Sequence, residues 1–256
     1  MHWNNAPERH VGGGRHANPE LPGHCAGCPV REAGVCGAAG IDGTRQFGRA
    51  ARGMSLKARE SVFAQGDPAS HLFNVVEGVV RLSKDLPDGR QQVLSFGTPG
   101  SVLGARGGGS MFGHSAVAVT PVRVCQVAWN RLERLLDRFP PMERRLREIV
   151  SADLEAAQDH MLTLGSKTAR ERVATFLLGL ARKEAAAAGE PHAPGGTVIP
   201  LPMSQTDIAA HLGLRIETVS RTFSDLSRKG LIQRSGPHRL RVLDARRLAS
   251  AAGGAA

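Results

Sequence analysis

Apolar and polar residues alternate in short runs over residues 56–129, and this pattern predicts β-strands. The stretch VFAQGDPASHLFNVVEGVVRL holds two apolar runs separated by turn residues, and Pro87-Asp88-Gly89 is a strong hairpin signal. A later run, VRVCQVAW, alternates and is rich in β-branched residues. Many short strands joined by glycine-rich turns predict a β-sandwich or a small β-barrel.

The apolar period changes after residue 130 and predicts one long helix over 131–166. One stripe of this helix is apolar, although a helix that joins two domains has little core of its own to face. We therefore expect the stripe to pair with a second copy of the chain in a homodimer. Packing onto the chain's own barrel is the alternative. The stripe comprises Leu146, Ile149, Val150, Leu154, Ala157, Met161 and Leu164.

The last third of the chain predicts a helix over 167–187, a linker AAAAGEPHAPGGT and then a helix-turn-helix. Ser204 is a good N-cap, and Asp207 completes an S-x-x-D capping pattern. Gly213 permits the sharp turn, and a second helix begins near Ile216. The segments LIQR and RLRVL, joined by a Gly-Pro turn, predict a two-stranded wing.

The second helix of this motif carries polar side chains near the end that would enter the major groove of DNA. Glu217, Ser220 and Arg221 lie opposite the apolar Val219 and Phe223, near the N-terminal end of the helix. Arginine pairs with guanine, and a carboxylate accepts a hydrogen bond from cytosine. A solvated salt bridge between Glu217 and Arg221 is the alternative. Residues placed to contact phosphates are Ser204, Arg215, Thr218, Arg228, Lys229, Arg234 and Arg239.

The charge distribution supports a polyanionic partner. The formal net charge is +10, and residues 167–256 carry 14 Lys/Arg against 7 Asp/Glu. A basic C-terminal third is typical of proteins that bind nucleic acid, although a well-solvated surface would look similar. No apolar run reaches the roughly 18 residues of a membrane span, and the N-terminus lacks an apolar signal region. We therefore expect a cytoplasmic protein.

Three of the four cysteines, Cys25, Cys28 and Cys36, lie within HCAGCPVREAGVC, and Cys125 follows far downstream. In the cytoplasm such a group binds metal more often than it forms disulfides. Four thiolates suit a [4Fe–4S] cluster or a zinc ion, and the three-plus-one distribution favours the cluster. Taken alone, Cys125 could be a buried small hydrophobe, and strand parity leaves its face open. His24 and His10 are less favoured substitutes as ligands.

The order of these parts resembles the Crp–Fnr superfamily of bacterial transcription regulators over roughly residues 24–250. The resemblance rests on SQTDIAAHLGLRIETVSR and QDHMLTLGSKTARERVATFL, and the spacing C-x2-C-x7-C resembles the Fnr branch, in particular its FnrN/FnrL-type oxygen-responsive iron–sulfur regulators. It implies an α+β fold with a cyclic-nucleotide-binding-like β-barrel (jelly roll), a long dimerisation helix and a C-terminal winged helix-turn-helix. The implied parts are a flexible tail 1–23, a cluster-binding loop 24–45, a sensory barrel 46–130, a dimerisation region 131–166 and a DNA-binding domain 167–256.

The resemblance also implies the chemistry. Cys25, Cys28, Cys36 and Cys125 would ligate an oxygen-labile [4Fe–4S] cluster that promotes dimerisation and DNA binding, and oxygen would inactivate the protein. The E-x-x-S-R motif formed by Glu217, Ser220 and Arg221 implies an inverted repeat with TTGAT-like half-sites. Ile216 stands where cAMP receptor proteins carry an arginine, so their half-site should not be read.

Further partners follow from the resemblance. Residues 85–90 match a loop that contacts RNA polymerase in relatives. Ala105 and His114-Ser115 stand where a cAMP-type pocket carries Glu and Arg-Ser, so we expect no cyclic nucleotide. One alternative is a cluster-free regulator of the same superfamily that senses redox state or a small ligand. An iron–sulfur enzyme is a further alternative, but no catalytic group accompanies the cysteines, and we expect no enzyme activity.

Overall fold

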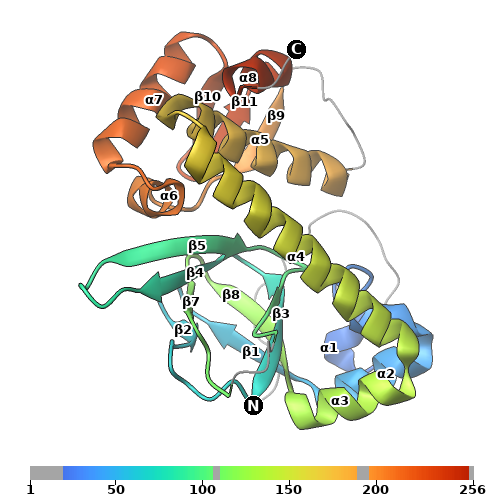
Figure 1. Ribbon diagram of the computed structural model, residues 1–256. Helices are drawn as coiled ribbons and strands as arrows, with labels where there is room; N and C mark the ends of the chain where they lie inside the picture. The colour runs from blue at the N-terminus through green and yellow to red at the C-terminus, as the bar shows by residue number, and fades with distance from the viewer. Residues whose placement is uncertain (1–19, 106–109, 189–195, 254–256) are drawn as a thin grey trace. The chain divides into compact units, whose positions relative to one another are not determined.

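The computed structural model describes residues 20–105, 110–188 and 196–253, which form two compact units (Figure 1). The first unit contains the residues up to Asp85 and Ser95–Asp153, and the second contains Leu86–Leu94 and the residues from Leu154 onward. The fold is α+β, as predicted. None of the helices in the described part of the chain is long and apolar enough to cross a membrane.

The first unit is built on two four-stranded sheets whose facing sides share a core. Val75 and Val124 from one sheet and Val80 and Ala116 from the other are fully buried in that core. This confirms the predicted sandwich or barrel. One sheet has the order β1 (Arg52–Leu56), β8 (Val122–Ala128), β3 (His71–Glu77), β6 (Val102–Leu103), and the other has the order β2 (Ser61–Phe63), β7 (Ser115–Ala118), β4 (Val80–Asp85), β5 (Gln91–Gly97).

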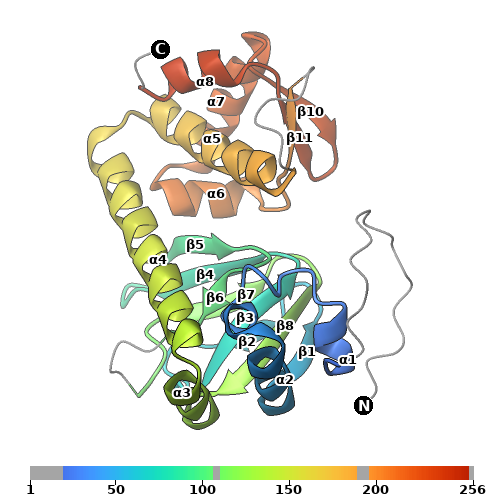
Figure 2. The same cartoon turned by 90° about the vertical axis from the view of Figure 1, so that its right-hand side faces the viewer.

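A second core lies on the outer side of the sheet that contains β3 and β8, where helices cover it (Figure 2). Leu72 of β3 and Val127 of β8 pack there with Phe47 and Leu132, which come from helices. This layer fixes the N-terminal loop against the sheet. The covering elements are α1 (Gly23–Ala26), the 3₁₀ helix η1 (Cys36–Ala39), α2 (Gly40–Ala50) and α3 (Trp129–Arg138).

The single helix predicted over 131–166 is wrong at its start, because two helices occupy this region. α3 ends at Arg138, and α4 runs from Pro140 to Ser166. Phe139 between them has a non-helical backbone with φ −125° and ψ 81°. The residue before a proline is disfavoured in the helical conformation, whereas proline is tolerated in a first helical turn. The apolar stripe therefore belongs to α4 alone.

The second unit contains the predicted helix-turn-helix and wing. The wing has three strands rather than the two predicted, because β9 pairs with β11 and Ile199 lies opposite Leu240. Part of the predicted linker lies outside the described residues. The elements after α4 are α5 (Ala169–Ala188), β9 (Thr197–Pro200), α6 (Gln205–Leu212), α7 (Ile216–Arg228), β10 (Ile232–Gly236), β11 (Arg239–Val242) and α8 (Ala245–Ala251).

Candidate functional site

Three cysteines lie in a compact loop that its own backbone hydrogen bonds hold together. α1 carries Cys25, and the amide of Cys28 donates to the carbonyl oxygen of Cys25 at 3.3 Å. Further along, the amide of Gly34 donates to the carbonyl oxygen of Val30 at 2.9 Å. Cys36 begins η1. All four cysteines of the chain are free thiols.

Two glycines that the sequence did not single out make room for this loop. A Cβ atom at Gly48 of α2 would lie 2.7 Å from Cys25 Sγ, and one at Gly37 would clash with the carbonyl oxygen of Arg31. Both distances are too short for a side chain. The backbone of α2 therefore approaches the sulfur of Cys25 closely at Gly48, where there is no side chain, and this contact positions the thiol.

Cys125 lies on the outer face of its sheet, which settles the question that strand parity left open. Along β8, Val122 and Val124 point into the core between the sheets, whereas Cys125 and Val127 pack on the helix side. In register, Cys125 lies opposite Asn74 of β3. Its side chain is therefore on the face that the N-terminal loop covers.

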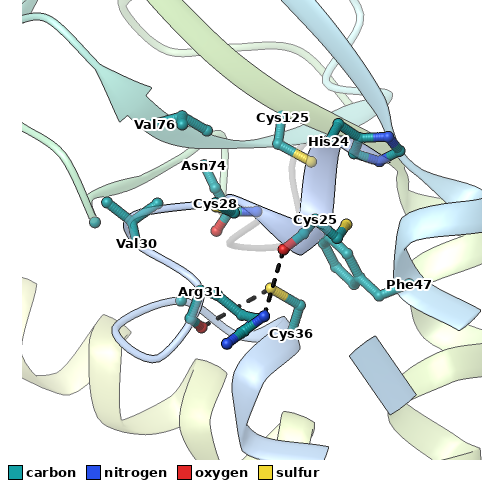
Figure 3. Close-up of a pocket in the computed structure, with 12 residues that line it drawn as sticks. His24, Cys25, Cys28, Val30, Arg31, Cys36, Phe47, Asn74, Val76 and Cys125 are labelled. Carbon is teal, nitrogen blue, oxygen red and sulfur yellow. Dashed lines mark hydrogen bonds between the residues drawn. The ribbon is translucent and has the colours of Figure 1, made fainter. Parts of the chain in front are cut away.

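The structure brings the four cysteines together, because all of them line one pocket (Figure 3). Among the described residues, no set of three or more His, Cys, Asp or Glu side chains is close enough to hold a single metal ion. The thiols thus share a pocket without forming the coordination sphere of one ion. The other residues that line it are His24, Val30, Arg31, Gly34, Phe47, Asn74, Val76 and Gly100.

Burial keeps three of these thiols neutral. It raises the pKa of Cys25 to about 11 and that of Cys36 to about 12, and it also raises the pKa of Cys125; neighbouring cysteines add to each shift. A thiolate in this pocket lacks hydration and needs a cation to compensate its charge. The donor chemistry therefore fits a metal cofactor that takes up thiolates and releases their protons on binding.

The cysteine loop also contacts the first turns of α4. Arg145 Nη2 donates a hydrogen bond to the carbonyl oxygen of Ala33 at 2.9 Å. Leu146 is buried in the same cluster as Val35, and Cys36 packs against that cluster. We therefore exclude Leu146, which we had placed in the dimer stripe, from the proposed dimer surface. The sequence places Arg145 among several charged residues that line the long helix and could tune pairing, but it gives no signal for this particular contact with Ala33.

The remaining residues of the predicted apolar stripe on α4 differ in how far their side chains are exposed. Ile149 is half-buried and packs against the chain's own core. Val150, Leu154 and Met161 expose 42%, 58% and 62% of their surface, and Ala157 between them is exposed. Leu162, which the prediction did not include, is also exposed, and Leu164 is half-buried. Large exposed apolar side chains in one row mark an interaction surface.

The helix-turn-helix forms as its local chemistry predicts. Ser204 caps α6, its hydroxyl accepts from the amide of Asp207 at 3.0 Å, and the Asp207 carboxylate closes the capping box. Gly213 ends the helix in the left-handed region at φ +61°. α7 begins at Ile216, and its side chains Val219 and Leu226 are fully buried.

The three candidate base-reading side chains are exposed on α7. Glu217, Ser220 and Arg221 all face solvent. Within the part of the chain that the structure describes, neither Glu217 nor Arg221 forms a salt bridge, so the alternative of an intrahelical pair has no support. Arg215 stands at the N-cap without a capping side-chain hydrogen bond. These groups are free to meet a ligand.

The residues predicted to contact phosphates differ in whether their side chains already have a partner within the chain. The Ser204 hydroxyl donates to the Asp207 carboxylate at 2.6 Å, so a phosphate would have to share it with the helix cap. Lys229 pairs with Asp225 at 3.2 Å, and Arg228 lies 3.9 Å from the same carboxylate. The remaining candidates, Arg215, Arg234 and Arg239, are exposed, and Thr218 is half-buried.

The position that would bind phosphate in a cyclic-nucleotide pocket is poorly suited to an anion. His114 packs edge-on against Phe63 with ring centroids 5.5 Å apart. Burial lowers its pKa, and Lys84 adds to this effect, so the ring is uncharged near neutral pH. A neutral ring supplies little compensation for a buried phosphate.

Two family models match this chain. A model of the Crp-like helix-turn-helix domain matches residues 171–251, and a model of the cyclic nucleotide-binding domain matches residues 54–139. Together they cover the second unit from α5 to α8 and most of the first. The matches agree with the wing and recognition helix and with the double sheet.

Several known proteins are similar over nearly the whole chain. The nitrogen fixation regulation protein FixK of Bradyrhizobium diazoefficiens is 41% identical over 214 residues, which is 83% of this chain and 88% of that protein. The transcriptional activator protein FnrL of Cereibacter sphaeroides is 32% identical over 93% of this chain and 95% of its own length. The structure of FixK2 from Bradyrhizobium japonicum has a TM-score of 0.71 at 36% identity and covers 80% of this chain and 99% of that chain.

Proposed function

Because the chain belongs to the Crp–Fnr superfamily of transcription regulators, in its Fnr branch, we propose that it is an oxygen-responsive regulator of anaerobic or microaerobic metabolism. It is a DNA-binding regulator and not an enzyme. The observation that carries the oxygen response is the pocket that all four cysteines line. The proposed cofactor is a [4Fe–4S] cluster, and the proposed active form is a homodimer.

Cys25, Cys28, Cys36 and Cys125 would hold the cofactor. When bound, a [4Fe–4S] cluster would supply an oxygen-labile link among the four thiolates. The chain's part is to present the four sulfurs at one pocket and to keep water away from them. Val30, Phe47 and Val76 line the pocket with apolar surface. Without a cation the buried thiols stay neutral, so the loop has no charged anchor to the sheet.

The loop is coupled to α4 by direct contacts. Arg145 donates to Ala33, and Leu146 packs in the cluster that includes Val35. A loop fixed to Cys125 therefore supports one position of the first turns of α4, and a released loop does not. If the fixed loop favours paired α4 and the released loop does not, a modest difference in free energy between these two forms is enough to shift the equilibrium between dimer and monomer. We propose that this difference biases α4 toward pairing through Val150, Leu154, Ala157 and Met161.

Pairing of α4 would give the DNA-binding form. A dimer presents two copies of α7 to successive major grooves, roughly 34 Å apart, so it matches an inverted repeat. Glu217, Ser220 and Arg221 would read TTGAT-like half-sites. RNA polymerase is the proposed further partner, through the exposed turn where Arg90 pairs with Asp88 at 2.6 Å.

Replacing Arg221 by alanine should weaken binding to the inverted repeat by about 1–3 kcal/mol per half-site, because a bidentate contact to guanine is lost. Binding to scrambled DNA should change little. Arg228→Ala is the matched control, since the loss of a phosphate contact should weaken binding to every sequence equally and lower its salt dependence. Fluorescence anisotropy with both DNA sequences measures the two effects. Equal losses for Arg221→Ala on both sequences would assign Arg221 to phosphate instead.

Anaerobic purification tests the proposed function as a whole. We expect a brown protein with four irons and four sulfides per chain that binds the inverted repeat, and air should bleach the colour and abolish this binding together. A colourless protein with one zinc per chain would overturn the cluster. Iron-free protein that binds the repeat equally well in air and in its absence would favour the cluster-free alternative within the same superfamily.

A further inference from the structure

Asn74 is a buried polar residue in an apolar strand, and its side chain has no hydrogen-bond partner among the described residues. It lies in β3 between Phe73 and Val75, and only 6% of its surface is exposed. Neither its Nδ2 nor its Oδ1 has a hydrogen-bond partner in the described part of the chain. Buried side-chain amides are nearly always hydrogen-bonded, because leaving one unpaired forfeits its hydration without compensation. The structure therefore requires a reason for an amide at this position.

The side chain of Asn74 is directed into the cysteine pocket. Asn74 lies opposite Cys125 in the register of β3 and β8, so the two side chains leave the sheet on the same face. It lines the pocket together with the four cysteines (Figure 3). A Cβ atom placed on Gly34 would lie 3.9 Å from Asn74 Oδ1, so the cysteine loop closes over the amide.

We infer that Asn74 is a positioning residue for the cofactor and that its Nδ2 donates a hydrogen bond to a sulfur held at this pocket. The inference rests on the proposed function. The thiolate and sulfide sulfurs of an iron–sulfur centre accept hydrogen bonds from N–H groups, so they are suitable partners for Asn74 Nδ2. The amide of Asn74 finds no partner among the described residues, and a filled pocket would supply one. Hydrogen bonds to sulfur are one of the means by which proteins tune iron–sulfur centres.

The test uses Asn74→Leu, which keeps the size of the side chain but removes the amide, and Asn74→Ala as a second variant. Ser83→Ala is the matched control, because Ser83 is also fully buried with an unpartnered hydroxyl but does not line the pocket. Without cofactor, Asn74→Leu and Ser83→Ala should both melt no lower than the wild type, because each removes an unpaired polar group.

After anaerobic reconstitution with iron and sulfide, only the Asn74 variants should differ from the wild type. They should release iron to a chelator on the order of 10-fold faster, as expected when a group that orients metal ligands is lost. In resonance Raman spectra the Fe–S stretching bands should shift less on transfer to heavy water, because one exchangeable N–H···S contact is missing. A purely structural role for Asn74 would leave that isotope shift unchanged.

The outcomes separate the inference from the function on which it rests. Reconstituted Asn74→Leu and Asn74→Ala with wild-type iron release and a wild-type isotope shift would overturn the inference alone. Wild-type protein that takes up no four-iron cluster would overturn the proposed function and the inference with it. Faster iron release and a smaller isotope shift in both Asn74 variants, with Ser83→Ala unchanged, would support the inference.

Discussion

A Cys28→Ala variant is expected to lose its iron, its visible colour and its specific DNA binding together. Cys28 lies in a short turn between Cys25 and Val30 and is only half-buried, so its truncation removes little packing. The remaining three cysteines cannot complete a four-thiolate site. Without the cofactor the loop no longer supports the first turns of α4, and affinity should fall toward the non-specific level, roughly 10³-fold or more.

Iron analysis, sedimentation and anisotropy under anaerobic conditions measure these three losses. Val30→Ala is the matched control, because Val30 lines the same pocket without contributing a sulfur. The second unit should remain folded in both variants, since the mutated residues lie in the first unit. Full anaerobic activation of a reporter gene by Cys28→Ala would refute a ligand role for this residue.

A Leu154→Arg variant is expected to stay monomeric and to bind only one half-site, even when its cofactor is intact. Leu154 is 58% exposed in the single chain, so the substitution should barely change the stability of the monomer. In a symmetric pair the same position is buried twice, and an unpaired buried charge costs roughly 3–5 kcal/mol. This cost opposes pairing directly, whether or not the cysteine loop is fixed.

Sedimentation of anaerobic protein with and without DNA measures the association directly. Ala152→Arg introduces the same charge two residues earlier, about 200° around α4, and serves as the control. It should leave both the dimer and the DNA binding intact. A dimeric Leu154→Arg protein with normal iron content would show that the chain self-associates through another surface.

Local chemistry made the second unit the most predictable part of the fold. The cap at Ser204, the left-handed Gly213 and the buried Val219 of α7 depend on neighbours within a few residues, and all three are confirmed, whereas Phe223 is only half-buried. β9 was missed because four residues, Thr197–Pro200, carry too short a pattern. The break between α3 and α4 could have been predicted, because consecutive prolines at 140 and 141 disfavour a continuous helix.

The sequence predicted which four cysteines come together at the candidate site, but it did not predict the residues around them. Spacing and family resemblance suggested the four cysteines, and the structure places them at one pocket. The role of Leu146 could not be read from helical periodicity, because the same stripe can face the chain's own core at one end and solvent at the other. Asn74 was overlooked, although one polar residue inside the run HLFNVV is a visible signal.

The bare backbone of α2 at Gly48 ties two positions of the chain to each other. A methyl group there would lie 2.7 Å from the Cys25 sulfur, which is too close for the thiol to keep its position. The two residues should consequently vary together during evolution. Relatives that keep a thiol at position 25 are expected to retain glycine at position 48, whereas a larger residue there requires changes at both Cys25 and Pro22, because a Cβ atom would also lie 2.9 Å from Pro22 Cγ.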